Sequence, residues 1–272
     1  MTSLRQDLSK RTFFVLSGVT NVLSKPLAIE ICRNLSSGSV VVLIDLHEES
    51  MQEIKKEIEL LERDVKVFCT PIQTWKDTNR TRFQQILNAI LNKYNSSGCN
   101  FELAFILHNE GTMATDDLME PSATDEWLSY VEQHLHAPVA LNRAFLHAPQ
   151  FSKITKLVVN ITSSLMIRPS VYNTMMCSCL SARDMYFRAM ANKEHGSGVN
   201  VLSYSPGILK THKPQRDSNQ NVIDLLHLDV ERRLLGLPRV GLKETSLKLI
   251  NILRETSFIS GQDVDYYDTF FI

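Results

Sequence analysis

Short runs of consecutive apolar residues recur along this chain, and most are followed by a longer segment with apolar residues at helical spacing. The clearest run, residues 40–44 (Val-Val-Val-Leu-Ile), is rich in β-branched residues and uncharged, which is typical of a parallel strand buried on both faces. Parallel neighbours need a long right-handed crossover, and the intervening segments are long enough to supply one. The alternation therefore predicts an α/β fold with a doubly wound, mostly parallel sheet and helices on both faces.

The same pattern predicts the position of each element. Strands are expected over residues 12–16, 39–45, 65–69, 101–107, 157–161, 198–205 and 260–265. Helices are expected from residue 25 and over residues 48–62, 82–93, 126–146, 175–193 and 243–255, with a kink or restart near Pro138. At 272 residues, 43% of them hydrophobic, the chain can bury one sizeable core. We therefore expect a single Rossmann-type domain over residues 1–272, with a seven-stranded sheet.

The composition argues against several classes of protein. The 29 basic and 30 acidic residues are dispersed, so no basic surface for nucleic acid is expected. No apolar run reaches the roughly 20 residues of a membrane helix. Five cysteines, at positions 32, 69, 99, 177 and 179, match no zinc-ligand spacing. Because the first residues also lack the apolar stretch of a secretion signal, we expect a reduced, cytoplasmic protein that binds neither metal, nucleic acid nor membrane.

The most informative stretch joins the fifth predicted strand to the helix that follows it. The strand continues into Asn-Ile-Thr-Ser at residues 160–163, and the helix begins about a dozen residues later. This arrangement resembles the catalytic segment of the short-chain dehydrogenase/reductases. Residues 181–188 (Ser-Ala-Arg-Asp-Met-Tyr-Phe-Arg) and 260–268 (Ser-Gly-Gln-Asp-Val-Asp-Tyr-Tyr-Asp) resemble one branch of that family, the sepiapterin reductases, which complete tetrahydrobiopterin synthesis. The resemblance spans essentially the whole chain and implies an NAD(P)H-dependent oxidoreductase.

The resemblance also implies a catalytic tetrad, of which this chain keeps one member. In the family, a serine pairs with a tyrosine thirteen residues on and a lysine four beyond that, and counting from Ser163 places these at Met176 and Leu180. His134 stands where the family has an asparagine. Methionine has no proton to give and leucine no charge, and a general acid is worth roughly 10²–10⁴ in rate. We expect lost or strongly weakened reductase chemistry. The alternative is an active NAD(P)H-dependent reductase in which substrate binding and Ser163 suffice, or in which Tyr172 donates the proton.

The dinucleotide turn of the family is altered as well. Its pattern Thr/Ser-Gly-x-x-x-Gly-x-Gly falls on residues 17–24, where Gly18 remains and Val22 and Ser24 replace the other glycines. Valine disfavours positive φ and occupies space that phosphates need, so we expect a damaged cradle or a plain turn without ligand. The resemblance implies NADP or NAD as cofactor. The implied contacts are Gly18, Asn21, Asp45, Asn109, Gly111, Pro206, Gly207 and Thr211.

Two acidic positions leave alternatives open, and one histidine is given a structural role. Asp45, at a strand end, suits a ribose 2′-hydroxyl and so favours NAD, or is simply a solvated carboxylate. Asp265 stands where the family anchors the guanidine-like edge of a pterin, or is a structural strand-end acid. We interpret His108 as a structural residue. The resemblance implies a pterin-like small molecule or another protein as ligand, and a homodimer formed through the helices at 126–146 and 175–193.

Overall fold

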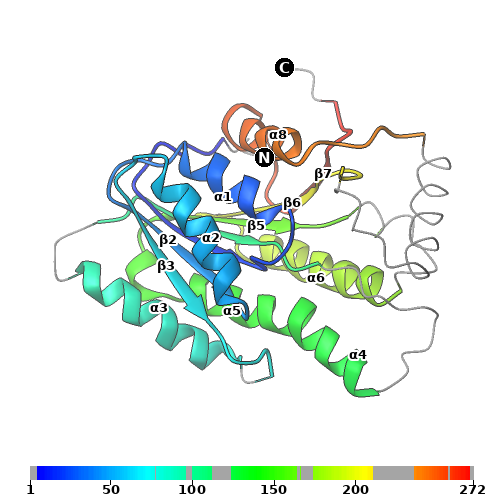
Figure 1. The fold of residues 1–272 in the computed structure, drawn as a ribbon, viewed down its shortest axis with the longest axis horizontal. Helices are drawn as coiled ribbons and strands as arrows, with labels where there is room; N and C mark the ends of the chain where they lie inside the picture. The colour runs from blue at the N-terminus through cyan, green and yellow to red at the C-terminus, as the bar shows by residue number, and fades with distance from the viewer. Residues whose placement is uncertain are drawn as a thin grey trace.

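A central sheet separates two layers of helices in the computed structural model (Figure 1), which describes residues 5–76, 78–95, 100–111, 124–163, 166, 174–210, 236–256 and 258–269. The strands are β1 (Thr12–Ser17), β2 (Ser39–Asp45), β3 (Val65–Pro71), β4 (Leu103–His108), β5 (Thr155–Ile161), β6 (Val199–Ser205) and β7 (Gln262–Asp265). They lie in the order β3-β2-β1-β4-β5-β6-β7, and every pair of neighbours is parallel. The predicted doubly wound, seven-stranded fold is confirmed, and its seven strands are all parallel rather than mostly so.

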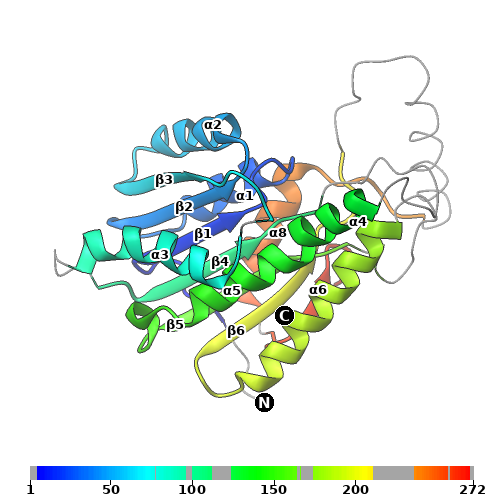
Figure 2. The ribbon, with the colours of Figure 1, turned by 90° about the horizontal axis from the view of Figure 1, so that it is seen from below.

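Each layer of helices packs on its own apolar core. Helices α1 (Ser24–Cys32), α2 (Glu48–Glu59) and α8 (Leu242–Glu255) cover one face. Helices α3 (Arg80–Asn95), α5 (Ala137–Leu146) and α6 (Thr174–Lys193) cover the other (Figure 2), and a short 3-10 turn, Pro149–Phe151, leads into β5. The strands serve both cores by alternation, so that β1 sends Phe14 and Leu16 to the first core and Phe13 and Val15 to the second. This two-sided burial explains the uninterrupted apolar runs.

The helix predicted over residues 126–146 contains an irregular turn. Helix α4 (Thr124–Val131) leads into a π-helical turn, Glu132–His136, and α5 follows with Pro138 in its first turn. In a regular α-helix the N–H of residue 138 would donate to the carbonyl of His134, but proline has no N–H. The sequence thus explains where the helical ladder breaks, and it leaves a main-chain carbonyl that needs a donor from elsewhere.

Polar side chains gather where the strands end, on the face covered by α5 and α6. Ser17, His108, Asn160 and Ser203 are all buried near the carboxyl ends of their strands. Each lies two residues after an apolar member of the second core, so all four leave the same face of the sheet. Ligands of doubly wound sheets bind outside the carboxyl ends of the strands. This edge is therefore where a functional site is expected.

Three expectations, about cysteines, metal ligands and membrane helices, concern the described part of the chain. Four of the five cysteines, at positions 32, 69, 177 and 179, are free thiols there, and Cys99 lies outside it. No cluster of histidine, cysteine and acidic residues able to hold a metal occurs among the described residues. In the same ranges, no helix has the length and hydropathy needed to cross a bilayer.

Candidate functional site

Asn21 stabilises the turn between β1 and α1 through hydrogen bonds of its side chain and its carbonyl. Its Oδ1 accepts a hydrogen bond from the N–H of Leu23 at 3.1 Å, and its Nδ2 donates to the carbonyl of Gly111 at 3.1 Å. The N–H of Ser24 donates to the carbonyl of Asn21 at 2.9 Å. Asn21 was expected to face a cofactor, and in the structure its side chain is bonded at both ends to the protein.

The N-terminus of α1 therefore offers few groups to an anion. The first amides of a helix bind phosphate because they have no partner within the helix. Here Leu23 and Ser24 use theirs in the turn, and position 26 is proline. Among residues 23–26 only Lys25 keeps an N–H without a described partner, and its ammonium lies 2.8 Å from Glu53 and 2.9 Å from Glu57.

Asp45 holds the same turn. Its carboxylate is 1% exposed. Oδ2 accepts hydrogen bonds from the N–H of Thr20 at 2.9 Å and from its hydroxyl at 3.2 Å, and Oδ1 accepts from the N–H of Leu46 at 2.6 Å. Three donors within the protein thus occupy the carboxylate, for which a ribose contact and a solvated strand end were the two alternatives.

The third glycine of the family pattern is replaced by a serine that fills its space with hydrogen bonds. Ser24 is fully buried, donates to the carbonyl of Gly18 at 2.7 Å and accepts from Asn109 Nδ2 at 2.6 Å. Gly18 itself has φ 71°, and a Cβ there would stand 2.5 Å from the backbone N of Glu110. Gly18 is therefore required by the approach of two backbone segments, whether or not a ligand binds.

These contacts do not fit a dinucleotide at this turn. A pyrophosphate needs free amides and glycine at the points of closest approach, whereas here the amides of Leu23 and Ser24 are bonded and Val22 projects from the turn with 54% exposure. An adenosine ribose needs an accessible carboxylate, and Asp45 is 1% exposed with both of its oxygens accepting hydrogen bonds within the turn.

The tetrad positions lie on β5 and α6. Ser163 is half-buried just beyond β5, and Met176 and Leu180 are 8% and 3% exposed on α6. A Cβ at Gly111 would lie 3.9 Å from Leu180 Cδ2, so the leucine packs against the segment that follows β4. Tyr172 and Thr211 lie outside the described residues.

A fully buried arginine joins the elements around these positions. Arg183 on α6 donates from Nε to Asn160 Oδ1 at 2.8 Å and from Nη2 to the carbonyl of Ile161 at 2.7 Å. Its Nη1 donates to the carbonyl of His134 at 3.1 Å and lies 3.7 Å from Glu110 Oε2. The guanidinium thus supplies the donor that Pro138 cannot, and it neutralises a buried acid.

Burial shifts the pKa values of the ionisable groups around Arg183. Burial raises the pKa of Glu110, with Arg183 opposing the shift. Burial, reinforced by the charge of Arg183, lowers the pKa of His108 and of His134 to about 3. Both imidazoles are therefore neutral near pH 7, and His108 Nδ1 lies 3.2 Å from the hydroxyl of Ser17. Neither histidine is poised as a general acid at neutral pH.

Sequence reasoning missed this buried pair. The available signal was an arginine at a position where α6 otherwise presents Met176, Leu180 and Phe187 to the core, together with an acid in the segment after β4. Each alone resembles a surface residue, and only the fold shows that Glu110 and Arg183 meet.

The opposite end of the edge carries Asp265. It is partly exposed, and its Oδ1 accepts a hydrogen bond from the N–H of Tyr267 at 2.9 Å. The neighbouring Pro206-Gly207 turn is tied to the fold. The carbonyl of Pro206 accepts from the hydroxyl of Thr245 at 2.9 Å. Gly207 has φ 76°, and a Cβ there would stand 3.1 Å from Val240.

Comparisons with known proteins agree with the fold and with the family resemblance. The model of the short chain dehydrogenase family matches residues 23–221. The chain is 25% identical to the sepiapterin reductase of Xenopus laevis over 98% of this chain and 100% of that protein, and 26% identical to that of Bos taurus over 95% of each. A benzil reductase of Bacillus cereus is 21% identical over 84% of this chain and 87% of that protein.

Solved structures resemble the chain in fold alone. A short chain dehydrogenase from Burkholderia cenocepacia in complex with NADP has a TM-score of 0.71 and 13% identity, over 94% of this chain and 96% of that one. The L-sorbose reductase from Gluconobacter frateurii, complexed with NADPH and L-sorbose, has a TM-score of 0.72 and 16% identity, over 96% and 97%.

Proposed function

This chain belongs to the short-chain dehydrogenase family, and from that premise we propose that it is a sepiapterin reductase-like protein whose reductase chemistry is lost or strongly weakened. It acts by binding, either to a pterin-like small molecule or to another protein. One observation carries the proposal: Met176 and Leu180, at the positions of the family's tyrosine and lysine, are buried apolar side chains on α6.

The requirements of carbonyl reduction explain why Met176 and Leu180 carry the proposal. Reduction of a carbonyl requires a proton at the oxygen as hydride arrives, and a positioned acid is worth roughly 10²–10⁴ in rate. A thioether and an isobutyl group supply neither the proton nor the positive charge that lowers the pKa of a donor. Ser163 remains beyond β5, but a neutral hydroxyl is by itself a poor proton donor.

The turn at α1 supports the same conclusion. A reductase of this family takes its hydride from a nicotinamide cofactor. The groups that would hold the cofactor are bonded to the protein through Asn21, Asp45 and Ser24. Loss of the acid and closure of the turn act on different steps, so each alone would slow turnover.

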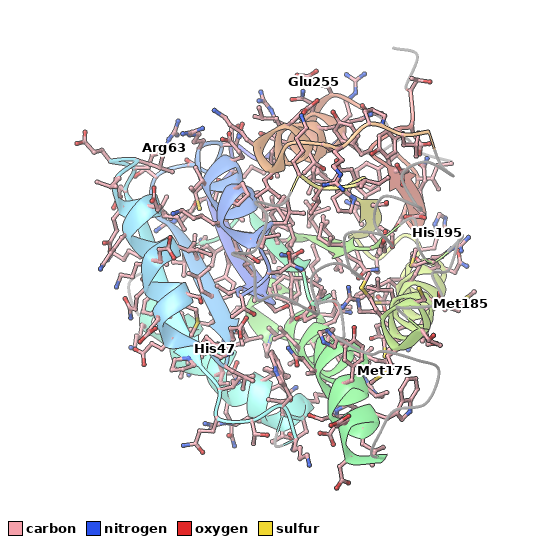
Figure 3. The ribbon with its side chains drawn as sticks, turned by 45° about the vertical axis from the view of Figure 1, so that its right-hand side comes forward. His47, Arg63, Met175, Met185, His195 and Glu255 are labelled. Atoms are coloured by element: carbon pink, nitrogen blue, oxygen red, sulfur yellow. The ribbon has the colours of Figure 1, made fainter. Side chains whose placement is uncertain are left out.

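The binding part of the proposal rests on Asp265. Its carboxylate is partly exposed, and one oxygen is used by Tyr267, which leaves the other for a ligand with paired N–H donors. The protein acts in the cytoplasm as a homodimer formed through α4, α5 and α6. Leu128 on α4 and Met185 on α6 are 51% and 61% exposed, and Figure 3 shows Met185 at the periphery of the molecule.

The test is a direct assay with a matched positive control. The purified chain is mixed with sepiapterin and either NADPH or NADH, in parallel with the Xenopus laevis sepiapterin reductase at equal concentration. We expect consumption of reduced nicotinamide at least 10²-fold slower than in the control, in line with the loss of a general acid. Turnover comparable with the control would refute the proposal. If Tyr172→Phe then abolished that turnover, the alternative reductase with a non-standard proton donor would be correct.

A second measurement tests binding without chemistry. Titration of sepiapterin into the protein by calorimetry, with no nicotinamide present, should give saturable binding that Asp265→Asn weakens. Asp125→Asn on the exposed start of α4 serves as the control variant. Absence of sepiapterin binding in the wild type would leave a protein partner as the ligand.

A further inference from the structure

The chain between β6 and α8 leaves the sheet and comes back to it at the same place. Residues 207–210, here called the outgoing stretch, follow β6, and residues 236–241, the returning stretch, lead into α8. Residues 211–235 join the two stretches and lie outside the described residues. The two stretches lie side by side, because Leu209 and Val240 form an isolated parallel β-bridge.

Two main-chain hydrogen bonds accompany this bridge. The N–H of Val240 donates to the carbonyl of Ile208 at 2.7 Å, and the carbonyl of Val240 accepts from the N–H of Lys210 at 2.7 Å. A pair of extended segments this short is at best marginally stable by itself in water. The pairing therefore needs support from another part of the fold, and the segment that follows β7 provides it.

The hydroxyl of Tyr267 is hydrogen-bonded to both stretches. It accepts a hydrogen bond from the N–H of Ile208 at 3.1 Å and donates to the carbonyl of Pro238 at 2.5 Å. Burial raises the pKa of Tyr267, with the N–H of Ile208 opposing the shift, so at neutral pH the hydroxyl keeps the proton that it donates. A single side-chain oxygen thus connects the outgoing stretch to the returning stretch.

Gly207 allows the ring of Tyr267 to approach. Its φ is 76°, in the left-handed region that residues with a side chain rarely adopt. A Cβ at this position would stand 3.1 Å from Cγ2 of Val240 and 3.3 Å from Cε2 of Tyr267. The outgoing stretch, the returning stretch and the tyrosine ring therefore meet where there is little room for a side chain, which accounts for the glycine without a ligand.

The segment that carries Tyr267 is fixed to the sheet and to α8 by other contacts. The N–H of Tyr266 donates to the carbonyl of Ser205 at 2.8 Å. The ammonium of Lys248, on α8, donates to the carbonyls of Tyr266 and Asp268. None of these contacts involves the hydroxyl of Tyr267. Removal of that hydroxyl should therefore leave the segment in place and affect only the two stretches that the hydroxyl joins.

We propose that the hydroxyl of Tyr267 controls the pairing of the outgoing and returning stretches. Without it the two stretches separate, while the sheet and α8 stay folded, because a pairing with few contacts opens at a lower free-energy cost than the whole domain. Both ends of the connection between β6 and α8 are thus positioned by one group beyond β7. The inference involves no ligand and does not depend on the proposed function.

Hydrogen exchange of individual amides, followed by NMR on the full-length protein, tests the inference. Tyr267→Phe keeps the ring and removes both hydrogen bonds of the hydroxyl. The amides of Lys210 and Val240 keep their own acceptors in this variant, so faster exchange there reports separation of the stretches. Each lost hydrogen bond is worth roughly fivefold in an equilibrium constant, and we expect these two amides to exchange about tenfold faster or more. Unchanged rates would overturn the inference.

The neighbouring tyrosine provides the matched control. Tyr266→Phe also removes one hydroxyl from the segment after β7, but that hydroxyl donates to Glu244 on α8 at 2.6 Å. We expect exchange at Lys210 and Val240 to change by no more than about twofold in this variant, because neither stretch loses a hydrogen bond to the tyrosine. Equal acceleration in the two variants would refute a specific role for Tyr267.

A reference amide distinguishes local opening from a general loss of stability. The N–H of Thr162 donates to the carbonyl of Tyr204 at 2.8 Å and so reports on the sheet. It should exchange at the wild-type rate in Tyr267→Phe. If Thr162 accelerated as much as the two amides of the stretches, or if the variant did not fold, the hydroxyl would support the whole domain and the inference would be wrong.

Discussion

The β1–β2 end and the β6–β7 end of the sheet's carboxyl edge differ in how far their polar groups are hydrogen-bonded within the protein. At the β1–β2 end, Asn21 and Asp45 are hydrogen-bonded to the turn they support. At the β6–β7 end, no ion pair to Asp263 or Asp265 occurs among the described residues, and Ser205 lacks any described partner. A buried polar group without a hydrogen-bond partner destabilises the folded state, whereas a buried polar group with a partner does not. The first end therefore supports the fold, and the second is the end to which our proposal assigns ligand binding.

Removal of the buried arginine should have the largest effect on stability. Arg183→Met leaves Glu110 as an unpaired buried charge and three acceptors without their donor, so unfolding free energy should fall by about 3–5 kcal/mol. Urea denaturation measures this. Arg188→Met, on the same helix but exposed, is the control and should cost about 0.5 kcal/mol or less. Equal losses in the two variants would contradict the role given to Arg183.

The two strand-end aspartates provide a direct comparison between the ends. Asp45→Asn loses an acceptor for Thr20 or Leu46 at a buried site, so it should lower the unfolding free energy by about 2–3 kcal/mol. Asp265→Asn keeps an oxygen for the N–H of Tyr267 and should change it by about 0.5 kcal/mol or less. The measurement is again urea denaturation at pH 7. If Asp265→Asn proved the more damaging, the assignment of scaffold and binding site would be reversed.

Asp263 should destabilise the fold when it is ionised. Because burial and the negative charge of Asp184 raise its pKa to about 6 from the ordinary 3.8, the native state holds a proton that the unfolded state has lost between these values. Stability then falls as pH rises through this window. Asp263→Asn lacks this loss, so relative to wild type it should gain on the order of 1 kcal/mol between pH 4 and pH 7. Melting temperatures at the two pH values test it, and a constant difference would contradict it.

The smallest expected effect is that of restoring the family's tyrosine and lysine, which should not recover reductase activity. Met176→Tyr with Leu180→Lys restores the residue types of the family acid and its cation, but the amides of Leu23 and Ser24 and the carboxylate of Asp45 stay bonded to the turn. We expect no measurable oxidation of NADPH or NADH with sepiapterin. Recovery of turnover by the double variant would mean that the cofactor turn opens and that the missing acid was the sole defect.

The fold was accessible from the sequence because burial on both faces of a parallel sheet leaves an uninterrupted apolar run in each strand. Residues 40–44 show this most clearly, and β7 was recognised from residues 260–268 by resemblance. The break near Pro138 was also predictable, because a missing N–H is a local property. The π-helical form of the turn at Glu132–His136 was not predicted.

The site was harder to predict from the sequence, because the role of each residue depends on partners that are distant in the sequence. Asp45 is an acid at a strand end in either interpretation, and only the contact with Thr20, 25 residues earlier, shows that it supports the turn. Asp263 attracted no notice because an alternating polar residue in a short strand is ordinary. Its neighbours Asp184 and Ser203 come from α6 and β6, and no local pattern links them.

The guanidinium of Arg183 is held partly by atoms that mutation cannot change. Two of its acceptors are the carbonyls of His134 and Ile161, which persist whatever side chains those positions carry, and the proline at 138 ensures that the first of them stays available. The positions that contribute to this interaction should therefore differ in their tolerance to substitution. Positions 134 and 161 are free to vary in side chain as long as the volume suits, whereas position 183 is confined to arginine, and a saturation library would show that asymmetry directly.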